Sequence, residues 1–356
     1  MKTNKFNLYF ITLTLLATSV MSCSTGRRKV TLRTSRPADI SVPPQVKSLL
    51  VVDRTKFNKN LLNVAESVLT GEFPEEDKAA TQALIQAFRA KLTASTRFTS
   101  KVAPIREEGN SMTTAFPKPL SWSKIQALCA TYKTDAVVAI EIFDTDFIIT
   151  HGTQKTKKKV KEGGVTKQVE VNEFYARGVN KIKVGIKFYI PANQSMIDQK
   201  LYKKTGTWKA AAATKSAAVR ALISKTNASR RTAEKIGRYY AYRISPMPMR
   251  ITRHFRGKAK RAPELEQGSR YADVAKWAEA IKVWKSGLGR ARNKESGYLA
   301  YNIAVGYEVL GDLRNAKEWA QTSYIRYGNK YGKEYYDLLQ RRIRNETRAK
   351  QQLNKE

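Results

Sequence analysis

The chain has 356 residues, and 66 Lys and Arg against 30 Asp and Glu give it a formal net charge of +36. This length is sufficient for two domains with their own cores, and the charge points to an anionic partner. With two His and two Cys, the sequence excludes a disulfide framework and a metal site built from clustered His and Cys.

The first 22 residues have the order of a secretory signal. Lys2 and Lys5 precede an apolar run at 8–16, and Ser22 lies directly before Cys23. The alternative is a membrane-spanning helix, but the whole apolar stretch before Cys23, about sixteen residues, would extend about 24 Å, short of the ~30 Å hydrocarbon core. The cysteine after a small residue resembles the lipobox of bacterial lipoproteins, which implies cleavage at 22 and a diacylglycerol on Cys23. Ser24 then implies the outer membrane, and we expect the protein to face the periplasm.

A polar tether is predicted over 23–44, followed by an α+β domain over 45–257. Buried strands are expected at 46–52 and 135–143, and helices at 60–69, 75–95 and 122–132. A β-meander follows at 165–176, 180–190 and 196–208, with Gly178 in one of its turns. Residues 181–188 alternate between apolar and basic positions, which predicts one buried face and one wet, basic face. Two helices, at 210–224 and 228–244, and a last strand at 249–255 complete this domain.

The C-terminal part is predicted to be all helical. A charged linker at 258–267 leads to helices over 268–345, and a polar tail occupies 346–356. The small and aromatic positions resemble a tetratricopeptide repeat, whose paired helices need small residues at their contacts. The residues that carry this resemblance are Ala280, Trp284, Ile303, Tyr307, Gly311, Ala316 and Ala320. An unrelated bundle of helical hairpins is the alternative, because only one complete repeat is visible.

The sequence predicts no catalytic residue, no metal site and no cofactor. His151 and His254 are isolated, and no glycine-rich phosphate loop or Gly-x-Ser-x-Gly motif occurs. Asp144 and Asp146, two residues apart beyond a strand, are the one pair from which a hydrolase could be built. Cys129, among apolar neighbours on a predicted helix, is expected to be a small buried hydrophobe.

Positive charge is concentrated between 200 and 261, where eighteen Lys and Arg residues stand against one acid, Glu234. We expect an anion-binding surface at Arg230, Arg231, Lys235 and Arg238, with Lys157, Lys158 and Lys159 as a second cluster. Its ligands would be lipid A, anionic lipid or an acidic glycan. A merely solvated basic face is the alternative, and the secretory signal argues against nucleic acid.

Two short segments resemble an uncharacterised outer-membrane lipoprotein family of Bacteroidota. The first is 36–43 (RPADISVP), followed by 49–54 (LLVVDR), and the second is 240–246 (YAYRISP). The resemblance implies an α+β body with a tetratricopeptide-like tail and supplies no activity. The layout is also loosely similar to curli-secretion-type lipoproteins. The leading hypothesis is a lipid-anchored, non-catalytic adaptor whose helical tail docks a protein, and the alternative is an anion binder.

Overall fold

The computed structural model describes residues 26–55, 74–104 and 115–353. The signal peptide, Cys23 and the predicted helix at 60–69 lie outside these residues. The chain divides into two compact units, each with its own core. We call Ser35–Pro248 with Glu346–Glu356 the α/β unit, and Met1–Thr34 with Met249–Asn345 the helical unit.

The α/β unit is built on a five-stranded sheet with the order β3-β2-β4-β5-β6. The strands are β2 (Ser48–Asp53), β3 (Thr99–Val102), β4 (Ala136–Glu162), β5 (Val165–Ile190) and β6 (Ser195–Ala212), with the short helix η1 (Pro191–Asn193) between the last two. β3, β2 and the start of β4 are parallel, whereas β4, β5 and β6 form an antiparallel meander. The parallel strands are nearly continuous apolar runs because helices cover both of their faces.

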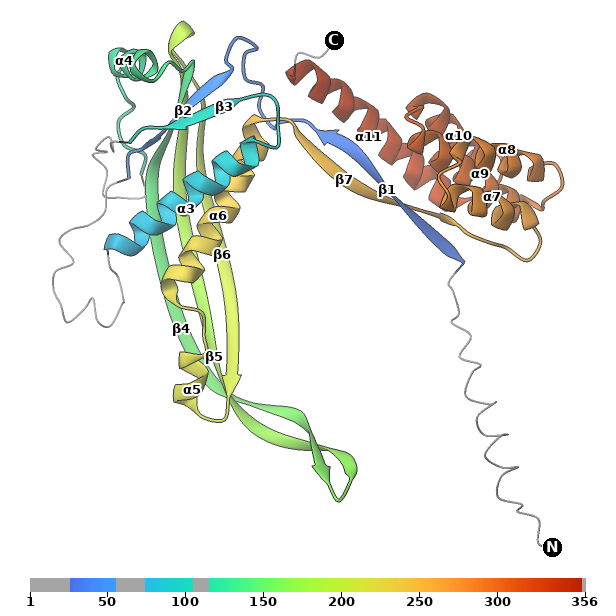
Figure 1. The fold of residues 1–356 in the computed structure, drawn as a ribbon, viewed down its shortest axis with the longest axis horizontal. Helices are drawn as coiled ribbons and strands as arrows, with labels where there is room; N and C mark the ends of the chain where they lie inside the picture. Colours follow the sequence, from blue (N-terminus) through green and yellow to red (C-terminus); the bar gives the residue numbers. More distant parts are fainter. Residues whose placement is uncertain (1–25, 56–73, 105–114, 354–356) are drawn as a thin grey trace, which may run out of the picture. The chain divides into compact units, whose positions relative to one another are not determined.

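Helices α3 (Pro74–Leu92) and α6 (Lys225–Ile244) pack on one face, where they bury Val51 and Val138. Helix α4 (Trp122–Tyr132) lies on the other face, against Leu50 and Val137, because neighbouring strand residues point to opposite sides (Figure 1). The hydroxyls of Ser121 and Ser224 cap α4 and α6 by accepting from backbone N–H groups.

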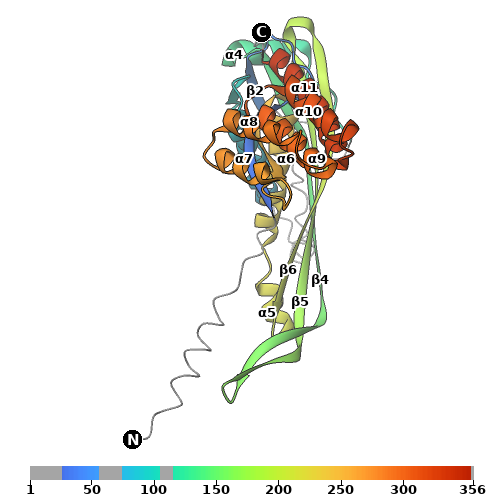
Figure 2. The same cartoon turned by 90° about the vertical axis from the view of Figure 1, so that its right-hand side faces the viewer.

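The β4–β5 hairpin extends beyond the rest of the sheet. Its pairing runs from Val137–Tyr189 to Glu162–Val165, whereas β6 accompanies it only as far as Phe174. Figure 2 shows the resulting two-stranded end continuing past the short helix α5 (Lys215–Arg220). We call residues 153–174 the hairpin ribbon; most of its residues are exposed.

The predicted turn at Gly178 is wrong, because Gly178 lies within β5 and pairs with Ile149. A Cβ at this glycine would lie 2.6 Å from the Phe147 ring, so the residue allows a close approach and makes no turn. The predicted helix at 210–224 is also shorter, since β6 continues to Ala212 and α5 begins at Lys215.

The helical unit combines a two-stranded sheet with five helices. β1 (Arg27–Arg36) pairs with β7 (Met247–Arg256), and both strands begin or end in the α/β unit. The helices are α7 (Pro263–Asp273), α8 (Trp277–Gly287), α9 (Asn293–Val309), α10 (Leu313–Ile325) and α11 (Lys330–Gln352). From α7 to α10 each helix packs on the next. The predicted fold class, a mixed α/β region with a meander before an all-helical region, is confirmed.

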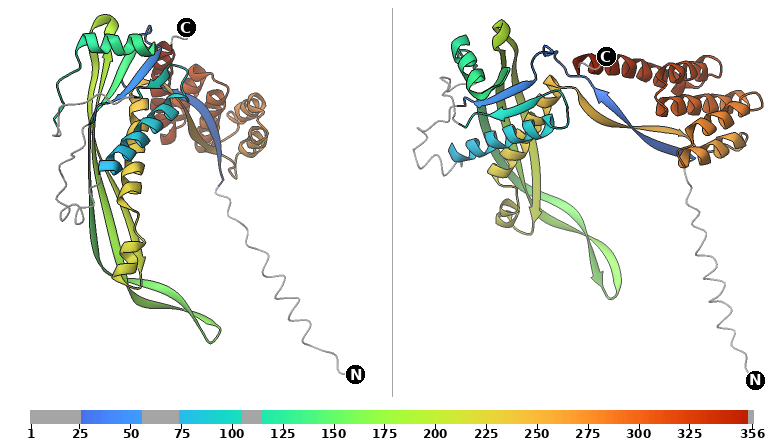
Figure 3. Two further views of the ribbon diagram at one scale, coloured as in Figure 1. Left: turned by 60° about the vertical axis from the view of Figure 1, so that its left-hand side comes forward. Right: turned by 45° about the horizontal axis from the view of Figure 1, so that its top comes forward.

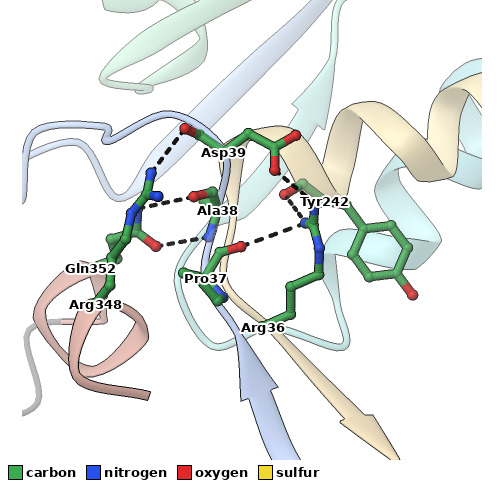
Figure 4. A network of polar contacts seen from close by, with 7 residues as sticks. All are labelled: Arg36, Pro37, Ala38, Asp39, Tyr242, Arg348 and Gln352. Atoms are coloured by element: carbon green, nitrogen blue, oxygen red, sulfur yellow. Dashed lines mark hydrogen bonds and ion pairs between the residues drawn. The ribbon is translucent and has the colours of Figure 1, made fainter. Parts of the chain in front are cut away.

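Both ends of the described chain are more ordered than predicted. Residues 27–36 form β1 instead of a polar tether, and α7 starts at Pro263, inside the predicted linker. Helix α11 continues through the predicted polar tail to Gln352, whose side-chain oxygen accepts from the Ala38 N–H at 2.8 Å (Figure 4). Arg348 donates to the Asp39 carbonyl at 2.9 Å. The polar side chains of the tail therefore satisfy backbone groups of a distant segment.

This contact also joins the segments 36–43 and 240–246. The N–H groups of Asp39 and Ile40 donate to the Arg243 carbonyl at 2.9 and 3.0 Å, and Arg36 donates to the Tyr242 carbonyl at 2.8 Å. Arg36 also forms an ion pair with Asp39 at 2.6 Å. The two segments thus contact each other within the α/β unit, and their role there is structural.

Candidate functional site

The four basic residues predicted on α6 lie on the exposed side of this helix. Arg231, Lys235 and Arg238 follow one another at spacings of four and three residues, which aligns them along one stripe. Ile236 and Tyr240 are buried on the opposite side. Glu234 lies 3.5 Å from Arg238 and is the one acid on this helix. The structure therefore places Arg230, Arg231, Lys235 and Arg238 on the outer side of one helix, where the first three are exposed and Arg238 is partly exposed.

The second predicted cluster is divided by the strand geometry. Lys157 and Lys159 pair with Glu170 and Gln168 on one face of the hairpin ribbon, whereas Lys158 pairs with Val169 on the other face. Lys158 also forms an ion pair with Glu173 at 3.1 Å. Figures 1 and 3 show the ribbon away from α6, so the two predicted clusters do not form one surface.

The carboxylates considered for catalysis lie beside lysines. The Asp144 carboxylate accepts from Lys183 at 2.9 Å, and Asp146 is opposite Lys181 in the β4–β5 register. Among the residues that the structure describes, no three His, Cys, Asp or Glu side chains are grouped to hold a metal ion. Cys129 is buried, as predicted, and burial raises the pKa of its thiol.

Two strand residues predicted on the wet face, Gly185 and Lys187, are buried. Lys187 is 1 % exposed, and its Nζ donates to the Pro117 carbonyl at 2.6 Å. Burial lowers the pKa of Lys187, and the Arg54 charge lowers it further, against the opposing effect of Glu141. The alternation of apolar and basic residues over 181–188 could not reveal that residues 116 and 117 cover this part of the sheet.

Lys187 belongs to a buried polar cluster at the point where β2 ends. Both carboxylate oxygens of Glu141 accept from the Arg54 Nη1, at 2.8 and 2.6 Å, and the Tyr189 hydroxyl donates to Glu141 at 3.0 Å. Burial raises the pKa of Tyr189, and the carboxylate charge adds to the shift, so the hydroxyl stays a donor. No sequence motif marked this cluster, because its members lie on three strands.

The helical unit contains a second buried carboxylate, which the sequence also did not reveal. Glu308 on α9 accepts two hydrogen bonds from Arg253 of β7, at 2.7 and 3.0 Å, and one from Arg342 of α11 at 2.6 Å. The Tyr335 hydroxyl donates to the same carboxylate. Burial alone would raise the pKa of Glu308, but these donors and the guanidinium charges hold it below its ordinary value.

The residues predicted to pack the helical repeat occupy the expected helices. Ala280, Trp284, Ile303, Ala316 and Ala320 are fully buried, whereas Tyr307 is half-buried and accepts from the Lys285 Nζ at 2.8 Å. Gly311 has a φ of +86° in the turn between α9 and α10, a conformation that favours glycine. These contacts hold paired helices together, and they do not by themselves define a tetratricopeptide repeat.

A cavity of about 270 Å³ opens beside this core, within the helical unit. Arg27, Arg256, Tyr298, Tyr301, Asn329 and Tyr331 line it, together with His254 and Phe255 from β7. The Arg256 guanidinium lies 5.0 Å from the centre of the Tyr298 ring. None of these lining residues is acidic. Sequence reasoning missed the cavity because its walls come from β1, β7, α9 and α11.

Exposed apolar side chains lie at the end of α10 and at the start of α11. Tyr331 is 65 % exposed, and Tyr324 and Ile325, at the end of α10, are 40 % and 69 % exposed. The start of α11 packs tightly on this end of α10, because a Cβ at Gly332 would lie 2.8 Å from the Tyr324 nitrogen. The three exposed side chains therefore belong to one end of the α10–α11 pair.

Family models cover nearly all of the described chain. The model of a domain of unknown function, DUF8603, matches residues 46–255, and a second one, DUF6340, matches 266–351. The chain belongs to the DUF8603 family. The first match coincides with most of the α/β unit, and the second with α7 to α11.

Other comparisons add little. No curated protein matches the chain. Two structures of the PelC dodecamer from Paraburkholderia phytofirmans, one of them a single-residue variant, are 9 % and 10 % identical to it. They cover 61 % and 59 % of this chain, with 99 % and 96 % of their own, at TM-scores of 0.27 and 0.25. With TM-scores under 0.5, neither match establishes a shared fold.

Proposed function

We propose that this protein is a lipid-anchored, non-catalytic binding module of the bacterial cell envelope, and that its helical unit docks a protein partner. The proposed location rests on the sequence. A secretory signal ends at Cys23, and the segments at 36–43 and 240–246 resemble an outer-membrane lipoprotein family of Bacteroidota. The described residues include no helix that is long and apolar enough to cross a bilayer. In this proposal, lipid on Cys23 supplies the attachment.

The observation that carries the docking function is the exposed apolar end of the α10–α11 pair. Ile325 and Tyr331 leave about two thirds of their surface open, and Tyr324 lies next to them. Contiguous exposed apolar side chains next to polar ones are typical of protein interaction sites. The paired helices resemble a tetratricopeptide repeat, an architecture that presents such surfaces.

Site-specific crosslinking in intact cells tests the docking function. A photoreactive residue at position 325 should give one crosslinked species of defined mass, whereas the exposed position 282 on α8 should not. Ile325→Asp should remove this partner without lowering the unfolding midpoint. Equal crosslinking at both positions, or retention of the partner by Ile325→Asp, would contradict the proposal.

The anchor is tested separately from the docking surface. Radiolabelled palmitate should enter the wild-type chain and not the Cys23→Ser variant, and this variant should leave the membrane fraction. If Cys23→Ser stays membrane-bound to the same extent, the lipid anchor is wrong.

The basic stripe of α6 supports a second candidate function, the binding of an anionic lipid or acidic glycan. Three exposed cations and the partly exposed Arg238 lie there with a single acid, Glu234, and Lys204 lies 4.7 Å from the ring of the neighbouring Tyr239. Replacement of Arg230, Arg231, Lys235 and Arg238 by Gln should abolish salt-sensitive binding to phosphatidylglycerol vesicles. Four exposed cations of the helical unit provide a matched control: Arg270, Lys276, Lys282 and Arg314. Equal losses in both quadruple variants would mean that only net charge matters.

A further inference from the structure

We propose that the cavity of the helical unit binds the C-terminal carboxylate of a partner protein's chain. This inference rests on the proposed docking function and adds the chemistry of the segment that is bound. The carboxylate would pair with Arg27 and Arg256, and the last side chain would lie against the tyrosine rings of the cavity.

The first argument is the charge that remains uncompensated around the cavity. Arg253 and Arg342 are both bound by Glu308, and Arg28 pairs with Asp273 at 2.6 Å. Among the described residues, no carboxylate lies within ion-pair distance of Arg27 or Arg256. Glu334, whose charge acts on Tyr301, pairs with neither of them. The cavity therefore presents two guanidinium groups, whose planar donors match a carboxylate in bidentate geometry.

The second argument is the size and lining of the cavity. About 270 Å³ lies just below the range of pockets for drug-sized ligands, and it suits one or two amino-acid residues. Tyr298, Tyr301 and Tyr331 supply rings for an apolar side chain. Burial raises the pKa of Tyr301, so its hydroxyl remains a neutral hydrogen-bond donor. A chain end combines these requirements, because it carries a side chain and a carboxylate on the same residue.

Asn329 has a structural role in this wall. Its Nδ2 donates to the Gly297 carbonyl at 3.1 Å and to the Ser323 hydroxyl at 3.0 Å, and its Oδ1 accepts from the Tyr331 N–H. These bonds hold the start of α11 against α9 and α10. Recognition is therefore assigned to the arginines and the rings, and Asn329 positions Tyr331.

The test measures peptide binding to the full-length chain in detergent micelles. The probes are twenty N-terminally labelled tetrapeptides, Ala-Ala-Ala followed by each amino acid, as free acids and as C-terminal amides, in fluorescence polarisation. We expect a subset with large apolar last residues to bind as acids, with affinity about 10-fold weaker for the amides. Arg27→Gln and Arg256→Gln should each weaken the acid by a similar factor, whereas Arg256→Lys, which keeps the charge without the planar fork, should weaken it less. Arg270→Gln, an exposed position on α7, is the matched control.

Three results would overturn the inference: equal affinity for acids and amides, no binding of any acid peptide, or tighter competition by glucuronate or inorganic phosphate than by the peptides. Thermal unfolding of each variant separates a lost contact from a lost fold, and both Arg27 and Arg256 are exposed, so neither substitution opens a core. Crosslinking at position 325 does not depend on the carboxylate. Its persistence without peptide binding would leave the docking function standing and remove this inference alone.

Discussion

Both units bury one glutamate, but they use it differently. In the α/β unit, Glu141 is 2 % exposed and binds Arg54, which follows β2 directly, and Tyr189 on β5. In the helical unit, Glu308 is 1 % exposed and binds Arg253 and Arg342 together with a tyrosine hydroxyl. Each carboxylate is therefore paired, as burial requires.

The difference lies in what else holds the bonded elements. The strands around Glu141 are already joined by the backbone ladders of β2, β4 and β5. The elements around Glu308 are a strand and two helices, which no ladder can join. Asn302, also on α9, bonds the Arg256 N–H and carbonyl at 2.8 and 2.7 Å, as a neighbouring strand would. Side chains of α9 thus hold β7 and α11 in place. The buried carboxylate therefore contributes more to the arrangement of the elements in the helical unit than Glu141 does in the sheet.

The largest expected effect is that of Glu308→Ala. The change removes the carboxylate that Arg253 and Arg342 share, although their side chains are only 11 % exposed, and we expect it to lower the free energy of unfolding by about 3–5 kcal/mol. Urea denaturation of the full chain measures this loss. Glu318→Ala, on the exposed side of α10, should change stability by less than about 0.5 kcal/mol. Glu141→Ala should lower the free energy of unfolding by less than Glu308→Ala does. An equal or larger loss would contradict the different roles assigned to the two glutamates.

A steric change probes the α/β unit, where helices α3 and α6 approach closely. A Cβ at Gly237 would lie 2.2 Å from the Leu84 carbonyl oxygen, and backbone atoms cannot move aside as a flexible side chain can. We expect Gly237→Ala to destabilise this unit by about 1–3 kcal/mol. Gly289→Ala is the matched control, because no atom lies within 4 Å of the added Cβ. Similar unfolding midpoints for the two variants would show that the α3–α6 contact can relax.

Local patterns predicted the elements whose partners are close or whose apolar runs are strong. The strand at 46–52, the helix at 122–132 and the apolar run at 135–143 all occur, and Ala280 and Ala316 are buried at helix contacts. The pattern failed where a distant segment decides the environment. Lys187 alternates as a surface residue would, but residues 116 and 117 cover it. Residues 346–352 were predicted to be a polar tail, because the backbone groups to which they bond lie more than 300 positions earlier and are not visible in the local sequence.

The candidate sites also differ in whether their residues are close in the sequence. A helical stripe is visible in sequence, so Arg231, Lys235 and Arg238 could be grouped from their spacing, and the structure places them on one helix. The adjacent lysines at 157–159 were treated as one cluster, although strand geometry sends Lys158 to the opposite face. Glu308 and the cavity could not be predicted, since their side chains are brought together from four elements by tertiary packing alone.

A smaller loss of stability is expected in the helical unit when acid protonates Glu308. The pKa of Glu308 is depressed in the folded chain, so its stabilising effect is complete above its unfolded value and disappears as the pH falls through the folded value. We therefore expect the helical unit to lose stability below about pH 4.5. The loss should be smaller than that of Glu308→Ala, because a protonated carboxyl still accepts hydrogen bonds. Urea denaturation between pH 7 and pH 3 measures it, and the slope should flatten in Glu308→Ala.

The smallest expected effect on stability is that of removing the hairpin ribbon. The variant joins Gln154 to Glu173, which are paired in the β4–β5 register, through an Asn-Gly turn. Val160, Val165 and Val169 share one face of the ribbon, where they are 44 %, 60 % and 44 % exposed, so their removal uncovers no core. A two-stranded ribbon also adds little stability of its own.

We expect the free energy of unfolding of this variant to stay within about 0.5 kcal/mol of the wild type, in urea at neutral pH. A loss of 2 kcal/mol or more would mean that the ribbon stabilises the fold. An unchanged stability would instead direct attention to the surface: lysines at 155, 157, 159 and 161 lie on one face, and the valines lie on the other. The valine face also carries the ion pairs Lys158–Glu173 and Lys167–Glu162, so its exposed apolar side chains lie among paired charges, which lowers the risk of edge-to-edge aggregation.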